Sequence, residues 1–200
     1  MKIIGLTGGI ASGKSTVSQT LKQLGAVLID ADEVYHKTIE PHQPAWEDIV
    51  RTFGEDVLHP DGMINRDKLA GIVFTQEDCL RALNEITHPR VGERFTEELK
   101  KIQISQPDAV VVIDVPLLYE THMDRLCDEV WVIWVDRETQ IQRLMNRNGY
   151  NRDEAIRRIE AQMSLDEKAK LADAVIDNRC SIEETIRTVT KYYKDILQKS

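Results

Sequence analysis

The stretch that decides the fold is Gly8-Gly-Ile-Ala-Ser-Gly-Lys-Ser15, which fits the pattern G-x-x-x-x-G-K-[ST]. The apolar run at 2–7 before it is typical of a short buried strand, and 16–24 after it carries apolar residues at helical spacing. Strand, glycine loop and helix are the context in which this pattern binds nucleoside triphosphate. A chance glycine-rich turn before a helix is the alternative, and the Lys-Ser pair in this context argues against it.

The chemistry of the loop follows from its residue types. Glycines let backbone N–H groups approach phosphate oxygens, and the helix N-terminus adds partial positive charge. Lys14 is expected to reach the β- and γ-phosphates, Ser15 to place its hydroxyl on Mg²⁺, and Thr16 to touch the α-phosphate side. The predicted nucleotide-binding residues of the loop are Gly8, Gly9, Ile10, Ala11, Ser12, Gly13, Lys14, Ser15 and Thr16.

Composition limits the class of protein. A chain of 200 residues suits one α/β domain with a small insertion, and 42% hydrophobic residues suffice for a core. No apolar run is long enough for a membrane span, the N-terminus lacks the pattern of a secretory signal, and the net charge of −8 argues against general nucleic-acid binding. Cys79, Cys127 and Cys180 lack paired spacing. We therefore expect a cytoplasmic protein with reduced thiols, either a monomer or a weak homo-oligomer.

Four further strands are predicted at 25–29, 109–113, 129–135 and 172–176. Continuous apolar runs separated by helices are typical of a parallel sheet covered on both faces. The expected fold class is therefore a P-loop α/β protein, a three-layer α/β/α arrangement around a five-stranded parallel sheet.

Residues 33–106 interrupt this alternation with helical patterns and turns. Pro89 is expected to end or kink a helical segment near His88, because proline lacks the N–H that a helix needs. A helical insertion between two strands suits an acceptor-binding subdomain. A purely structural helical cover is the alternative.

A second helical excursion covers 137–171 and is rich in arginine. Arg143 and Arg147 are four residues apart and share a helix face, and Asn151 with Glu154 predicts a helix start after a glycine turn. Two such helices suit a lid over a triphosphate, since phosphoryl transfer needs cations beyond the loop. A solvated helix face with intrahelical ion pairs is the alternative.

Carboxylates follow two predicted strands at the edge where ligands bind in α/β sheets. Asp30 and Asp32 share a side if the extended backbone continues, and one can orient an attacking hydroxyl while the other caps a helix; Asp32 is the better candidate. Asp114 ends the most β-branched strand and can hold Mg²⁺, directly or through water, or cap the strand end. His88 stands out beside Pro89, although such a histidine is often structural.

These motifs together resemble those of the dephospho-coenzyme A kinases. The resemblance covers residues 1 to about 195, and the combination is more specific than the glycine loop alone. The matching stretches are Leu6–Thr16, Ile29–Asp32, Phe53-Gly54, Asp61-Gly62, Asn65-Arg66 with Leu69, His88-Pro89, Val115–Leu118, the arginine-rich stretch up to Gln162, and Ala172–Asn178. Ala11 stands where many relatives have glycine, at a position that tolerates the change.

The resemblance implies a kinase that uses ATP to phosphorylate the ribose 3′-hydroxyl of dephospho-CoA, the last step of coenzyme A synthesis. It implies a nucleotide-binding core at 1–32, 107–136 and 172–200, an acceptor subdomain at 33–106 and a lid at 137–171. The implied catalytic residues are Asp32, Lys14 and Arg143, with Arg147 and Asn178 at the nucleotide and Ser15 and Asp114 at the metal. The implied acceptor-binding residues are Asp32, His88, Pro116, Leu117 and Leu118.

Other triphosphate-binding classes fit less well. A GTPase switch carries an Asn-Lys-x-Asp tetrapeptide, and a transporter ATPase carries a Ser-Gly-Gly signature, and neither occurs in this sequence. A kinase for another small hydroxyl acceptor, such as a nucleoside, is the nearest alternative, since the glycine loop alone does not select the acceptor.

Overall fold

The computed structural model describes residues 1–73 and 75–199, with Lys199 described through its backbone only. The chain forms two compact units. The first comprises 1–30 and 106–200, and the second comprises 31–105. The stretch 137–171, expected as a lid, lies in the first unit with the sheet.

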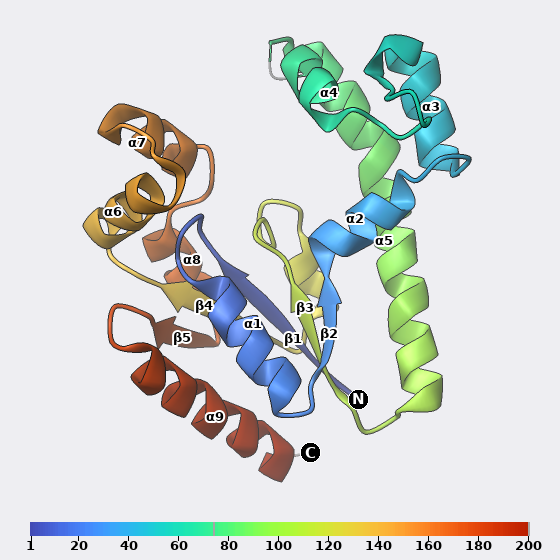
Figure 1. Ribbon diagram of the computed structural model, residues 1–200. Helices are drawn as coiled ribbons and strands as arrows, with labels where there is room; N and C mark the ends of the chain where they lie inside the picture. The colour runs from blue at the N-terminus through green and yellow to red at the C-terminus, as the bar shows by residue number, and fades with distance from the viewer. Residues whose placement is uncertain (74, 200) are drawn as a thin grey trace. The chain divides into compact units, whose positions relative to one another are not determined.

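The first unit is built on a five-stranded parallel sheet in the order β2-β3-β1-β4-β5 (Figure 1). Its strands are β1 (Lys2–Gly8), β2 (Val27–Asp30), β3 (Val110–Asp114), β4 (Glu129–Trp134) and β5 (Ala174–Asp177). In the central register, Ile4 lies opposite Val112 of β3 and Glu129 of β4. All five predicted strands are confirmed, with ends shifted by at most two residues.

The first unit also contains helices and a 3₁₀ turn. They are α1 (Lys14–Gln23), the 3₁₀ turn η2 (Met123–Leu126), α6 (Arg137–Asn148), α7 (Arg152–Glu160), α8 (Leu165–Leu171) and α9 (Ile182–Lys199). Leu21 of α1 and Val189 and Tyr193 of α9 share one core with Trp131 of β4. Figure 1 shows α1 and α9 running side by side along the sheet. This packing fixes the start of α1 at the end of β1.

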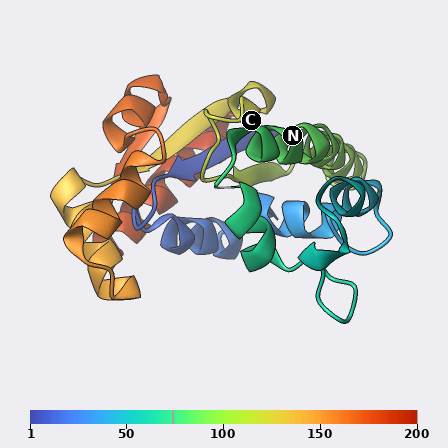
Figure 2. The same cartoon turned by 90° about the horizontal axis from the view of Figure 1, so that it is seen from above.

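Helices α6 and α7 form a pair joined at Gly149, whose φ of 71° suits glycine (Figures 1 and 2). The side chain of Asn151 accepts a hydrogen bond from the N–H of Glu154 at 2.9 Å, so the predicted start of α7 is confirmed. Asp136 caps α6 in the same way, accepting from the N–H of Thr139 at 2.9 Å. Local capping therefore defines the starts of both helices.

The second unit is helical, as predicted, with one isolated bridge between Leu58 and Ile64. Its elements are α2 (Ala31–Thr38), α3 (Pro44–Phe53), the 3₁₀ turn η1 (Glu55–Val57), α4 (Arg66–Val73) and α5 (Glu77–Ser105). A separate apolar core that includes Ile49, Leu69 and Leu83 joins these helices.

Of the two outcomes expected for Pro89, an end or a kink of the helix near His88, the end is wrong, because α5 continues through Pro89. Side-chain donors serve carbonyls in the turns around the proline: the Thr87 hydroxyl donates to Leu83 at 2.9 Å, and the Arg90 guanidinium donates to Ile86 at 2.6 Å. Arg90 also pairs with Asp48 of α3. Packing of α5 against its neighbours thus outweighs the local preference of proline. Among the residues that the structure describes, no helix has the length and apolar character to cross a membrane.

Candidate active site

The glycine loop occupies the turn between β1 and α1. Gly13 precedes the first residue of α1 with φ 89°, and a Cβ there would collide with the side-chain amide of Asn178. At Gly9 a Cβ would lie 2.6 Å from Nε2 of Gln140. Ser12 N–H donates to the Gly9 carbonyl at 3.1 Å, which closes the turn. The loop therefore has the tight backbone and the adjoining helix N-terminus that phosphate binding requires.

Two predicted site residues from distant parts of the sequence meet at this loop. The buried Asn178 donates from Nδ2 to the carbonyl of Ser12 at 2.7 Å and accepts at Oδ1 from the Thr185 hydroxyl at 2.8 Å. The half-buried Arg143 donates from Nη2 to the Asn178 carbonyl at 2.8 Å, and its Nη1 lies 3.8 Å from the position of a Cβ on Gly13. Asn178 thus tethers the loop, and Arg143 brings a guanidinium to it.

The other arginines of the expected lid differ in setting. Arg147 is exposed and donates from Nε to Oδ1 of Asn148 at 2.8 Å. Three more form surface ion pairs, Arg137 with Glu160, Arg152 with Glu138 and Arg158 with Glu154. Arg158 and Glu154 pair within α7, as the solvated-face alternative expects, whereas the other two pairs join α6 to α7. Hydrogen bonds from Arg152 and then from Gln142 lower the pKa of Glu138 to about 2.

Lys14 and Asp114 form an ion pair at the end of β3. Asp114 is buried, whereas Ser15 is exposed in the first turn of α1. A carboxylate and a hydroxyl are oxygen ligands that Mg²⁺ accepts, and Mg²⁺ beside a nucleotide keeps waters and phosphate oxygens as further ligands. In the described part of the chain no group of three or more His, Cys, Asp or Glu could hold a metal by itself. Ser15 and Asp114 therefore fit a metal held mainly by the nucleotide.

Two glutamines from the stretch 137–171 hydrogen-bond to the middle of the glycine loop. The N–H of Ile10 donates to Oε1 of Gln162 at 2.8 Å, and Nε2 of Gln140 donates to the carbonyl of Ile10 at 2.7 Å. Ile10 and Ala11 also pack against the small core of α6 and α7. The sequence showed no sign of the Gln140 contact, because 130 residues separate its partners.

Strand β3 leads into a loop at 115–120, where three acceptor-binding residues were expected. Pro116 is half-buried and Leu117 is 39% exposed, so both offer surface to a ligand. Leu118 is fully buried, and its Cδ2 lies 2.9 Å from the position of a Cβ on Gly5. The expected contact of Leu118 with the acceptor is not supported, because its side chain packs in the core.

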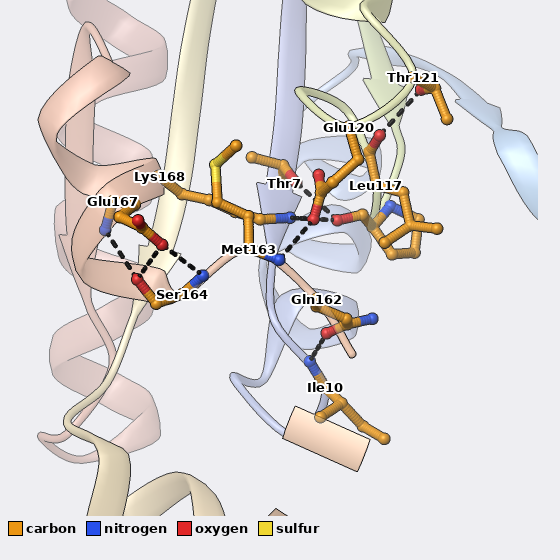
Figure 3. A network of polar contacts seen from close by, with 11 residues as sticks. Thr7, Ile10, Leu117, Glu120, Thr121, Gln162, Met163, Ser164, Glu167 and Lys168 are labelled. Atoms are coloured by element: carbon orange, nitrogen blue, oxygen red, sulfur yellow. Dashed lines mark hydrogen bonds and ion pairs between the residues drawn. The ribbon is translucent and has the colours of Figure 1, made fainter. Parts of the chain in front are cut away.

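The same loop meets α8 through a buried lysine (Figure 3). Lys168 is fully buried, and its ammonium donates to the Pro116 carbonyl at 2.7 Å and pairs with Oε1 of Glu120 at 3.0 Å. Burial lowers the pKa of Lys168, while the hydrogen bond and charge of Glu120 oppose the shift and the charge of Lys14 adds to it. Sequence reasoning missed this residue, although its place three positions after the buried Leu165 on α8 could have marked it.

Asp32 and His88 belong to the second unit. Asp32 is exposed in the first turn of α2, which begins at Ala31 directly after Asp30. The extended backbone that would place Asp30 and Asp32 on the same side therefore does not continue. His88 is exposed on α5 and lines a cavity of about 420 Å³ with Pro89.

A larger cavity of about 630 Å³ lies within the second unit. Apolar side chains such as Ile39 and Leu83 line it together with the polar Tyr35, Arg66 and Asn84. Arg66 also contacts the ring of His36. A mixed lining of this size suits an organic ligand with apolar and anionic parts.

Taken together, a parallel sheet, a strand–glycine loop–helix junction, and a lysine and an arginine at that loop define a P-loop phosphotransferase. The sequence model of the dephospho-CoA kinase family matches residues 2–184. The dephospho-CoA kinase of Carboxydothermus hydrogenoformans is 50% identical over 197 residues, covering 97% of this chain and 95% of the relative.

Solved structures agree with the sequence match. A crystal structure from Thermus thermophilus has a TM-score of 0.82 at 32% identity, covering 97% of each chain. Dephospho-CoA kinase from Campylobacter jejuni has a TM-score of 0.77 at 27% identity, covering 100% of this chain and 99% of its own. The chain belongs to the dephospho-CoA kinase family. It is an ATP-dependent kinase that phosphorylates dephospho-CoA in coenzyme A biosynthesis.

Proposed function

We propose that the chain transfers the γ-phosphoryl group of ATP to the ribose 3′-hydroxyl of dephospho-CoA, with Lys14, Asp32 and Arg143 as catalytic residues. The observation that carries the proposal is the meeting of Gly13, Arg143 and Asn178 beside a lysine at the start of α1. It supplies a backbone cradle and two cations for one triphosphate.

The donor side is the loop itself. Residues 8–16 bind the phosphates through backbone N–H groups, and Lys14 exchanges Asp114 for the β- and γ-phosphate oxygens when ATP binds. Ser15 and Asp114 would hold Mg²⁺, Asp114 directly or through water. A metal held there would supply positive charge against the triphosphate. Asn178 keeps the loop closed from behind, and its place near the nucleotide base is part of the same proposal.

The lid supplies further positive charge. Arg143 shifts from the Asn178 carbonyl toward the transferred phosphoryl group, and Arg147, four residues further along α6, approaches the nucleotide from the same helix. Closure of 137–171 over the nucleotide excludes water from the transfer. Charge stabilisation of this kind is the main catalytic contribution in phosphoryl transfer.

The proposed acceptor residues lie on α2, on α5 and in the loop that follows β3. Asp32 accepts a hydrogen bond from the 3′-hydroxyl and orients it for attack. Dephospho-CoA has a pantetheine arm that combines apolar groups with amides, and it has an anionic diphosphate. These features suit the mixed cavity lined by Arg66 and Leu83. His88, Pro116 and Leu117 complete the acceptor contacts from exposed or half-exposed positions. The proposal assigns the core to 1–32, 107–136 and 172–200, the acceptor region to 33–106 and the lid to 137–171.

The proposed setting is the cytoplasm, with ATP and dephospho-CoA as small-molecule partners. The protein acts there as a monomer or weak homo-oligomer, without nucleic-acid or membrane partners. An acidic chain with local basic zones at 1–24 and 137–158 suits a small polyanionic ligand.

Asp32→Asn tests the acceptor half of the proposal. The amide cannot take up the proton of the hydroxyl, so kcat should fall at least about a hundredfold, as for the loss of a general base. ATP affinity measured by calorimetry should stay unchanged. Glu33→Gln, a neighbouring exposed acid on α2, is the matched control and should keep kcat. Reduced ATP affinity in Asp32→Asn with normal kcat at saturation would show that Asp32 does not orient the hydroxyl.

A further inference from the structure

Lys168 is a buried cation that contacts two points of the same loop. Its ammonium donates to the Pro116 carbonyl at 2.7 Å and pairs with Oε1 of Glu120 at 3.0 Å. The Thr7 hydroxyl, from β1, donates to the same Pro116 carbonyl at 3.1 Å. In Figure 3, Lys168 and Glu120 point toward one another from α8 and from the loop. One side chain on α8 thereby fixes both ends of the segment 116–120.

The segment between these points is a turn with bonds of its own. The Thr121 hydroxyl donates to the Leu117 carbonyl at 2.8 Å (Figure 3). The N–H of Met123 donates to the Leu118 carbonyl at 2.9 Å. The chain leaves the sheet after Val115, whose N–H still donates to the Leu6 carbonyl of β1 at 3.0 Å. Fixing the loop by Lys168 therefore also fixes the chain that leaves Asp114.

Glu120 links this loop to the end of the lid. Its Oε1 accepts a second hydrogen bond from the N–H of Met163 at 3.0 Å, next to Gln162, which holds Ile10 of the glycine loop. Its Oε2 is buried and has no hydrogen-bond partner within the described residues. Lys168 is the cation that offsets the charge of this carboxylate, so loss of Lys168 leaves a charge poorly compensated.

We propose, on the basis of the phosphoryl transfer proposed above, that Lys168 is a positioning residue. Its ammonium holds the loop 115–120, and with it the Asp114 end of β3 and the exposed Leu117, in register with α8 and the glycine loop. Displacement of a positioning group by about 1 Å can cost about a hundredfold in rate even when it lies away from the reacting atoms. A buried ion pair serving only stability is the competing explanation.

The decisive variant is Lys168→Met with Glu120→Gln. It removes both charges of the pair, and the glutamine still offers an oxygen to the N–H of Met163. We expect a thermal midpoint close to that of the wild type and a kcat at least about tenfold lower, because the Pro116 carbonyl loses its lysine. The stoichiometry and affinity of ATP binding, measured by calorimetry, should stay unchanged. The stoichiometry gives the concentration of folded nucleotide sites, and kcat is calculated per such site. Lys170→Met, an exposed lysine on the same helix, is the matched control and should keep kcat.

Thr7→Val keeps the inference testable if the double variant does not fold. It removes the second donor to Pro116 without touching a charge, and kcat should fall about threefold to tenfold, the size expected for one hydrogen bond. A wild-type kcat in the folded double variant, or in Thr7→Val, would overturn the positioning role. If the wild-type protein itself forms no product from dephospho-CoA, the proposed function fails instead, so the two failures are distinguishable.

Discussion

Asn178 holds the phosphate loop from 166 residues away in the sequence: its Nδ2 donates to the carbonyl of Ser12 at 2.7 Å. Both residues are buried, and the other end of the amide accepts from the Thr185 hydroxyl. The end of β5 therefore sets the shape of a loop that begins at the end of β1. This link connects the last strand of the sheet to the loop proposed to bind ATP.

Asn178→Ala should weaken ATP binding. The change leaves the buried Ser12 carbonyl without its donor, which costs about 1–3 kcal/mol and corresponds to a KM for ATP raised at least about fivefold. Asn146→Ala, an exposed asparagine on α6, is the matched control. Steady-state kinetics with ATP varied will measure both variants, and an unchanged KM in Asn178→Ala would rule out the tether.

Arg143→Ala should lower kcat about a hundredfold, by analogy with the loss of one donor that stabilises transition-state charge. Arg158→Ala provides the contrast, because its exposed pair with Glu154 on α7 is worth little and kcat should stay within about twofold. The measurement is turnover at saturating ATP and dephospho-CoA. Equal rates in the two variants would remove Arg143 from the catalytic set.

Lys14→Ala should nearly abolish transfer, with kcat lowered about a hundredfold to a thousandfold. The ellipticity of the folded protein should persist, because the core of α1 lies at Val17 and Leu21. Lys22→Ala, an exposed lysine on the same helix, should turn over normally. Turnover near the wild-type value in Lys14→Ala would contradict the assignment of the phosphate lysine.

The cysteines should differ in reactivity. Burial, followed by the charges of Asp124 and Asp128, raises the pKa of the Cys127 thiol from 9.0 to about 12, whereas Cys180 is exposed. The folded state therefore retains the proton, and the stability that this group contributes is present below pH 9 and is lost between pH 9 and 12. At about pH 8, iodoacetamide should label Cys180 at least about tenfold faster than Cys127. Peptide mass mapping will measure the two labelling rates. Equal rates in the folded protein would contradict the prediction, whereas equal rates in urea are expected.

Features set by short-range chemistry could be predicted from the sequence. The glycine loop, the strands and the Asn151 cap follow from residue type and spacing over a few positions. The ion pair between Lys14 and Asp114 could also have been predicted. Lys14 comes shortly after β1 and Asp114 is the last residue of β3, and these two strands are neighbours in the parallel sheet.

Contacts between residues far apart in the chain could not be predicted from the sequence. The partner of Lys168 lies 52 residues earlier in the chain, and Gln140 contacts a loop 130 residues away. Pro89 shows the same limit for local structure, because the expected helix end gave way to tertiary contacts of Arg90. A buried polar side chain is recognised only when the elements around it are in place.

The most direct test of the central claim is the product formed from ATP, Mg²⁺ and dephospho-CoA. Mass spectrometry with fragmentation locates the added phosphate, and a nucleoside in place of dephospho-CoA tests the nearest alternative acceptor. We predict coenzyme A carrying the phosphate on the ribose 3′-oxygen, formed with one ADP per product and at a far lower rate in Asp32→Asn. Phosphorylation of the nucleoside with no 3′-phosphorylated product from dephospho-CoA would contradict the account.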